Sequence, residues 1–207
     1  PTRALFCARG QYDSPASDVE CCATRGGDGQ PSYRAGDITV SAGTTATVKL
    51  EYDVARSLYP EEPLALPTGA SVSATIAGHA PVPATSVGPL RMPAELKLTT
   101  PAVSAGRPAL AREGFDVAWD APAASGGRVL VAIEQVDPRS NVPVEVTCTA
   151  PDTGTFRMST LLLRENLTTA AGHLRVERLA TARRTLAGGS GATLRALHGV
   201  RVEISIR

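Results

Sequence analysis

The stretch from Phe115 to Phe156, FDVAWDAPAASGGRVLVAIEQVDPRSNVPVEVTCTAPDTGTF, alternates apolar runs with clusters of turn-forming residues. Its first run has Phe115, Val117 and Trp119 on one face, which is the period of a half-buried strand. Its second run is apolar at every position from 129 to 133, as in a central strand that is covered on both faces. The stretch therefore predicts successive strands joined by turns, with Trp119 as a core anchor.

The same stretch ends in VEVTCTAPDTGTF, where valines and Cys148 alternate with Glu145, Thr147 and Thr149. Side chains two residues apart on a strand share a face, so the sulfur of Cys148 is predicted to point to the core. The turn PDTG then leads into a short strand that contains Phe156.

The period of two recurs through most of the chain outside its first 35 residues. Alternating segments occur at 38–40, 46–52, 72–76, 96–98, 174–176 and 200–206. Residues 80–93, APVPATSVGPLRMP, are predicted to form an irregular edge strand, because proline cannot donate to a ladder. One short helix is predicted from Ser159 to Asn166, with Ser159 or Thr160 as N-cap.

These patterns predict an all-β protein with antiparallel sheets, because no predicted helix is long enough to cross over between parallel strands. Residues 1–35 are rich in turn formers and charge and are predicted to form an irregular arm that contains cysteines. Residues 36–101 and 102–207 form two β halves. Since 36–101 alone would be marginally stable, we expect the halves to form one compact unit or two closely packed lobes.

Composition indicates a globular chain of 207 residues, 43% hydrophobic, with a formal net charge of +1. This charge and the lack of basic runs with interleaved aromatics argue against nucleic-acid binding. The densest basic patch, Arg175 to Arg184, is predicted to be a solvated strand face. No apolar segment reaches the roughly 18 residues that cross a bilayer.

The source and the compartment are also indicated by the sequence. Lys49 and Lys97 are the two lysines, against a background rich in arginine, alanine, glycine and proline, which suggests a GC-rich bacterial genome. The chain begins at Pro1. We expect either that an export or anchoring segment has been removed, or that the sequence has been trimmed.

The four cysteines, Cys7, Cys21, Cys22 and Cys148, are disulfide candidates. Their spacing does not match a structural zinc site, and a bond between the adjacent Cys21 and Cys22 would be strained. Two pairings remain: Cys7–Cys21 with Cys22–Cys148, or Cys7–Cys22 with Cys21–Cys148. Either would close a loop of about 15 residues, worth on the order of 3 kcal/mol, and tether the arm to the β body. The alternative is four reduced thiols in a cytoplasmic protein.

No catalytic residue, metal ligand or cofactor-binding residue is predicted. His79, His173 and His198 occur without a nucleophile elbow, an HExxH zinc motif or a phosphate-binding glycine loop. Asp116 and Asp120 flank Trp119 and form a carboxylate pair of the kind that cleaves glycosides. Their alternation is more typical of a solvated strand face.

Several motifs together resemble a known module. These are GDITVSAGTTATVKL, GASVSATIAGHAPVPATSV, PAELKLTTPA, FDVAWDAP, VEVTCTAPDTGTFRMSTLLL and GHLRVERL, which span about residues 36–179. They resemble the immunoglobulin-like β-sandwich module of exported lipoproteins from myxobacteria and their relatives, a family with no agreed activity. The resemblance implies a sandwich fold and a cell-envelope location. Cys7, Cys21 and Cys22 lie outside the shared pattern.

The sequence thus predicts a non-catalytic, exported binding or structural module, in the periplasm, at the outer-membrane surface or outside the cell. The expected partner is another envelope or surface protein, with no nucleic acid and no membrane span. Aromatic residues make up only 4% of the chain, which favours protein contacts over stacking on carbohydrate. The alternative is an unrecognised envelope hydrolase, which would need a pocket that brings a histidine to a nucleophile.

Overall fold

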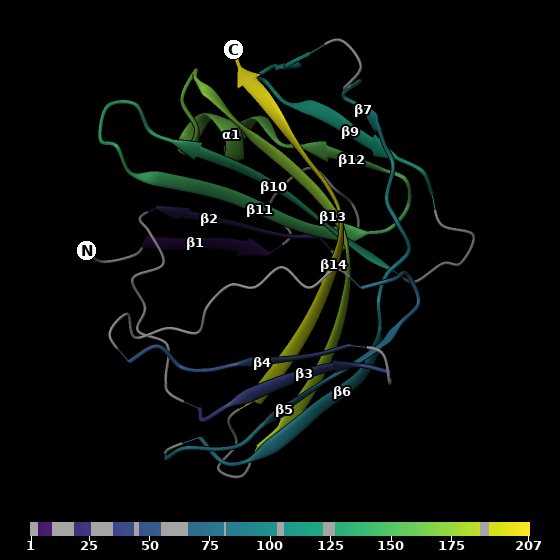
Figure 1. The fold of residues 1–207 in the computed structure, drawn as a ribbon. Helices are drawn as coiled ribbons and strands as arrows, with labels where there is room; N and C mark the ends of the chain where they lie inside the picture. The colour runs from purple at the N-terminus through teal and green to yellow at the C-terminus, as the bar shows by residue number, and fades with distance from the viewer. Residues whose placement is uncertain are drawn as a thin grey trace. The chain divides into compact units, whose positions relative to one another are not determined.

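The computed structural model describes residues 4–9, 19–25, 35–43, 46–54, 66–80, 82–102, 106–121, 127–186 and 191–207; of residues 4–9, 24, 25 and 46 it describes the backbone alone. Within these residues the chain is all-β, as predicted, with three sheets and one short helix, α1 (Thr160–Asn166) (Figure 1). The specifically immunoglobulin-like arrangement stays a prediction.

The first sheet has, in spatial order, β1 (Ala4–Arg9), β2 (Glu20–Arg25), β11 (Pro143–Pro151), β10 (Arg128–Val136), β13 (Ala171–Thr185), β14 (Gly191–Ile206) and β8 (Ala109–Leu110). The second has β12 (Thr155–Met158), β9 (Phe115–Trp119) and β7 (Leu98–Thr100). The third has β4 (Ala46–Leu50), β3 (Ile38–Ala42), β5 (Ser71–Ile76) and β6 (Thr85–Arg91).

The chain divides into two compact units that are discontinuous in sequence. Unit 1 comprises Pro1–Gly29, Glu95–Leu179 and His198–Arg207, and unit 2 comprises Gln30–Ala94 and Ala180–Leu197. This division differs from the expected boundaries at residues 35 and 101. The reason is that the long neighbouring strands β13 and β14 each contribute residues to both units, which the alternation of single residues does not reveal.

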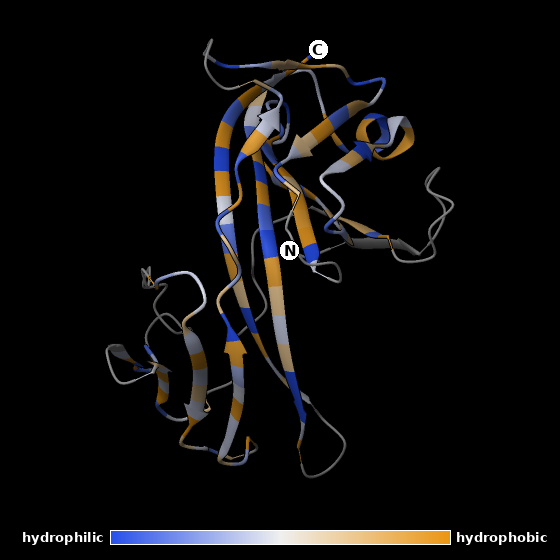
Figure 2. Cartoon of the chain, turned by 90° about the vertical axis from the view of Figure 1, so that its right-hand side faces the viewer, coloured by the Kyte–Doolittle hydropathy of each residue, from blue (hydrophilic) through white to orange (hydrophobic). Residues whose placement is uncertain are grey.

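The strands predicted from Phe115 to Phe156 build the core of unit 1. In β10, residues 129–133 are all buried, which confirms a strand covered on both faces. In β11, Val144, Val146 and Cys148 are buried and the intervening Glu145, Thr147 and Thr149 are half-buried, which confirms the predicted alternation. Figure 2 shows such alternation as hydrophobic and hydrophilic bands along the strands.

The helix α1 follows the predicted position. Ser159 is its N-cap residue, with extended backbone and no side-chain capping bond. Leu162 and Leu163 on its inner side are buried in the core of unit 1. The Oγ1 of Thr160 instead donates to the backbone carbonyl of Glu113, which ties the start of the helix to the turn before β9.

The prediction of an irregular N-terminal arm is wrong for residues 4–9 and 20–25; residues 1–3, 10–18 and 26–34 lie outside the described residues. Residues 4–9 and 20–25 form β1 and β2, which pair with each other antiparallel, and β2 also pairs antiparallel with β11. The turn-forming residues around these short segments conceal them in the sequence. The edge of β11 supplies backbone hydrogen-bond partners that override weak local propensity.

The expectation of purely antiparallel sheets is wrong at one edge. There, β8 pairs in parallel with β14 through Ser205 opposite Ala109 and Ile206 opposite Leu110. A crossover helix is needed only when parallel strands follow each other closely in the sequence. The strands β8 and β14 are separated by most of unit 1, so no such helix is required.

In unit 2 the third sheet has the strands that the sequence predicts, and β6 lies at its edge, as expected for residues 80–93. Its register against β5 shifts between Val72 and Ala74. At this shift Gly88 has φ +111°, and a Cβ on it would lie 2.8 Å from the carbonyl oxygen of Val72. The irregular edge therefore depends on a glycine that tolerates positive φ and close backbone approach.

Candidate functional site

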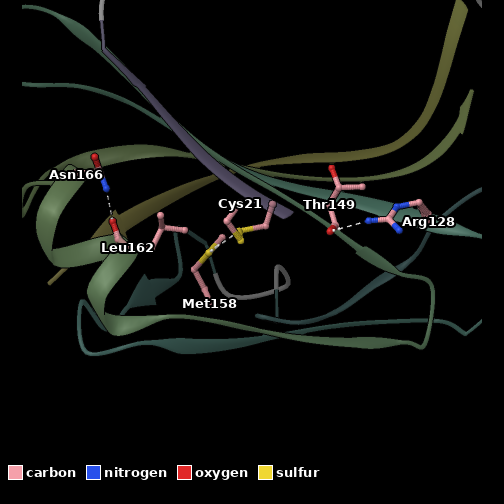
Figure 3. Close-up of a disulfide and its surroundings, with 7 residues drawn as sticks. Cys21, Arg128, Thr149, Met158, Leu162 and Asn166 are labelled. Atoms are coloured by element: carbon pink, nitrogen blue, oxygen red, sulfur yellow. Dashed lines mark hydrogen bonds between the residues drawn. A yellow bond between two sulfur atoms is a disulfide. The ribbon is translucent and has the colours of Figure 1, made fainter. Parts of the chain in front are cut away.

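The disulfide between Cys21 and Cys148 joins β2 to β11 and selects the second of the two predicted pairings. The two residues lie directly opposite each other in the strand register, with Cα atoms 4.1 Å apart. Both are buried, and the Sδ of Met158 packs 3.8 Å from the Sγ of Cys148 (Figure 3). Cys148 faces the core as predicted, and the bond links β2 covalently to β11 within the first sheet.

Cys22 is disulfide-bonded as well. In the register of β1 and β2 the residue directly opposite Cys22 is Cys7. The side chain of Cys7 lies outside the described residues, so the Cys7–Cys22 bond stays a prediction that the backbone register favours. Cys21 and Cys22, as neighbours on one strand, point to opposite faces of the sheet. Their partners accordingly come from different strands.

Trp119 is a buried anchor of the unit 1 core, as predicted, with 4% of its surface exposed. Its indole Nε1 donates to Asp152 Oδ1 over 2.6 Å. The carboxylate of Asp152 also accepts from Arg178 Nε at 2.8 Å, and both charged side chains are almost fully buried. A buried ion pair that is also hydrogen-bonded to Trp119 satisfies the polar atoms of this part of the core.

Arg178 contradicts the prediction that residues 175–184 form a solvated face. Besides Asp152, its guanidinium donates to the backbone carbonyls of Glu95 and Asp120. Arg178 therefore joins the segments before β7 and after β9 to β13. The sequence offered no signal for this role, because the turn that holds Asp152 and the strand that holds Arg178 meet only in the folded chain. This network is structural, since its donors are already bonded within the protein.

Arg175, three residues earlier, is the centre of a second charged cluster. Its guanidinium lies 3.4 Å from Glu134, 3.1 Å from Glu145 and 3.2 Å from Glu177. Arg201 binds the second oxygen of Glu134 at 2.7 Å. Burial raises the pKa of the Glu177 carboxyl above its ordinary value of 4.5, although the adjacent Arg175 acts in the opposite direction. The cluster cross-links β10, β11, β13 and β14 on one face of the first sheet.

The residues considered for catalysis do not come together. Asp116 is exposed and ion-paired with Arg157 at 3.1 Å. Asp120 accepts the backbone N–H of Lys97 at 2.8 Å. Asp116 is therefore a strand-surface contact, as the alternation predicts, whereas Asp120, just after β9, also lies 3.4 Å from the buried Arg178.

The histidines are distributed over both units. His79 is exposed in unit 2, where its backbone bridges to Val82. His173 on β13 and His198 on β14 are half-buried and belong to unit 1. Within the described residues no group of three or more histidine, cysteine, aspartate or glutamate side chains is arranged to hold a metal ion.

Unit 2 contains a large apolar cavity that sequence reasoning missed. Its volume is about 690 Å³. The lining residues come from β3, β4, β5, β6, the segment before β6 and the adjoining ends of β13 and β14: Ile38, Val40, Leu50, Ala74, Ile76, Val82, Pro83, Val87, Leu186, Gly191, Ala192, Thr193 and Leu194. All of them except Thr193 are apolar or glycine, so the cavity offers hydrophobic contact and almost no hydrogen bonding.

The cavity adjoins the packed core of unit 2, since Val40 and Leu194 line it and also pack against that core. Ala42, Val72, Leu90 and Ala196 form the packed core of the unit. The lining includes Ala74 on β5 and Ala192 on β14, whose small side chains leave space beside them. The sequence predicts which residues point inward but not the distance between the layers, which decides whether small side chains close the space.

No protein-family model, no curated protein and no solved structure matches the chain. No helix in the described part of the chain is long and apolar enough to cross a bilayer.

Proposed function

We propose that the protein is an exported, non-catalytic binding module of a bacterial cell envelope. Support for export comes from the disulfide between Cys21 and Cys148 and from the disulfide-bonded state of Cys22. Disulfides persist in oxidising compartments and are rare in the cytosol. The resemblance of residues 36–179 to lipoprotein modules supports the same location.

The observation that carries the binding role is the cavity of unit 2. Small-molecule sites are concave, mostly apolar and typically about 300–1,000 Å³ in volume; at about 690 Å³ the cavity lies within this range. An open pocket of this volume, lined almost entirely by apolar side chains, supports a role in binding an apolar ligand.

The test is titration of the full chain with the neutral fluorophore N-phenylnaphthylamine, whose emission rises in apolar surroundings. Ala74 lines the cavity, whereas its neighbour Thr75 is exposed on the other face of β5. The wild-type protein and Thr75→Leu should bind the probe alike. Ala74→Leu should weaken binding about tenfold or more, because its added methyl groups occupy the cavity.

Circular dichroism on both variants separates loss of the site from loss of the fold. The proposal is wrong if the wild-type protein leaves the probe's emission unchanged, or if folded Ala74→Leu binds it as tightly as wild type. Contact with another envelope protein stays a prediction from the sequence, which partner capture from envelope extract would test. The alternative of an envelope hydrolase likewise stays a prediction.

A further inference from the structure

One edge of the unit 2 cavity carries an available positive charge. Arg184 lies on β13 two residues before Leu186, which lines the cavity. Alternation along the strand puts Arg184 on the same face as Ala182, which packs against the core of unit 2. Its Nη1 donates to the backbone carbonyl of Ser86 at 3.0 Å, and Ser86 precedes the lining residue Val87. The guanidinium therefore lies where β13 and β6 border the cavity.

The guanidinium of Arg184 retains donors for a ligand. An arginine side chain has five N–H donors. Within the described residues, Arg184 makes the one bond to Ser86 and no ion pair with a carboxylate. The side chain is also exposed. A planar guanidinium with free donors fits the oxygens of a carboxylate or a phosphate in a bidentate manner.

A second cation, Lys49, lies near the cavity in the sequence, but alternation along β4 turns its side chain to the opposite face from Leu50. Lys49 precedes the lining residue Leu50, and its Nζ lies 2.9 Å from Asp37 and 2.9 Å from Glu51. Hydrogen bonds to Glu51 and Asp37 raise the pKa of Lys49, which keeps the ammonium protonated. Two carboxylates surround one ammonium here, so Lys49 offers no free charge to a ligand of the cavity.

We propose that the cavity binds a single-chain anionic amphiphile, with its hydrocarbon chain against the apolar lining and its oxyanion head group on Arg184. The inference rests on the proposed function and adds the class of ligand. A carboxylate head, as in a fatty acid, and a phosphate head, as in an alkyl phosphate, share the required chemistry. Affinity should rise with chain length by about fourfold per methylene until the cavity is full.

The experiment measures displacement of N-phenylnaphthylamine from the full chain by decanoate, dodecanoate, dodecyl phosphate and the neutral dodecyl maltoside, all below their micellar concentrations. The variants are Arg184→Gln and the matched control Arg183→Gln, whose side chain alternates to the opposite face of β13. Arg184→Gln should weaken dodecanoate and dodecyl phosphate about five- to tenfold and leave the maltoside unchanged. Arg183→Gln should change none of them.

The outcomes separate the two proposals. If wild-type protein does not bind the probe, the proposed function itself fails. If the probe and the maltoside bind but Arg184→Gln leaves the anions unaffected, or weakens the maltoside equally, the head-group inference is overturned and the cavity role stands. If Arg184→Gln selectively loses affinity for either anion, the inference is supported. The anion that binds wild type more tightly then identifies the head group. The head-group inference also predicts that high salt weakens binding of the anions to wild type but not to Arg184→Gln.

Discussion

The indole of Trp119 and the carboxylate of Asp152 are joined by a 2.6 Å hydrogen bond in unit 1, and the same carboxylate neutralises Arg178. Asp152 and Arg178 are 3% and 6% exposed, respectively, at their side chains. Removing the charge of Asp152 would leave Arg178 as a buried cation with only neutral partners and the more distant Asp120 at 3.4 Å. Removing one partner of this ion pair should therefore cost more stability than replacing both partners by apolar side chains.

The first prediction is that Asp152→Asn lowers the free energy of unfolding by about 3–5 kcal/mol, the range for breaking one side of a buried pair. Asp116→Asn is the matched control, because it breaks the exposed pair with Arg157, and it should cost no more than about 1 kcal/mol. Urea unfolding followed by tryptophan emission measures both. Equal costs for the two substitutions would contradict the structural role of Asp152.

The second prediction concerns disulfide connectivity. Proteolytic peptides of the unreduced, alkylated protein should contain Cys21 linked to Cys148. The register of β1 against β2 adds that Cys22 should be linked to Cys7. Because Cys21 and Cys22 are adjacent, the assignment requires fragmentation of the linked peptides by mass spectrometry. Four alkylated thiols without reductant would exclude both bonds and point to a reducing compartment.

The third prediction is the contribution of the Cys21–Cys148 bond to stability. The two residues are 127 positions apart in the sequence, and the chain-entropy model assigns a loop of this order about 5 kcal/mol. The double variant Cys21→Ala, Cys148→Ala should therefore unfold at a much lower urea concentration than wild type. A change below about 1 kcal/mol would show that the bond adds little to the strand pairing it spans.

The fourth prediction follows from Glu177, whose pKa is raised by burial. A carboxyl with a higher pKa folded than unfolded binds more protons in the folded state, so stability falls as the pH rises through its folded pKa. The loss of stability caused by ionising Glu177 is absent below its ordinary pKa of 4.5 and fully present above its folded pKa. Glu177→Gln should remove this loss, so its stability relative to wild type should increase from acidic to neutral pH. A pH-independent difference would contradict it.

The fifth prediction tests the irregular edge strand β6. Gly88→Ala combines a positive φ with a Cβ only 2.8 Å from a backbone oxygen, and it should destabilise by about 2–3 kcal/mol or more. Gly69→Ala has φ +77° but nothing within 4 Å of the added carbon. It should therefore lose only the about 1–2 kcal/mol that a side chain costs at positive φ. Thermal unfolding of both variants compares them. A smaller loss for Gly88→Ala than for Gly69→Ala would contradict the close approach.

Much of the fold was predictable because alternation is a local property. The burial of Val117, Trp119 and Cys148 followed from which neighbours were polar. The helix start at Ser159 was predicted from a capping residue before a leucine run, although the serine side chain makes no capping bond. The strands β1 and β2 were not predictable in this way. The segment of β2 becomes a strand because β11 offers it an edge, and β1 pairs in turn with β2. Such pairings are invisible to a reading of neighbouring residues.

The sequence alone determined that this chain is all-β, that its strands alternate inward and outward residues, and that Trp119 and Cys148 belong to the core. The tertiary structure alone decided that Cys21 is the partner of Cys148, that Arg178 is buried against Asp152 and that unit 2 has an apolar cavity. The physical reason is range. Alternation depends on residues two positions apart, whereas a disulfide, a buried ion pair and a gap between layers depend on distances between segments far apart in the chain.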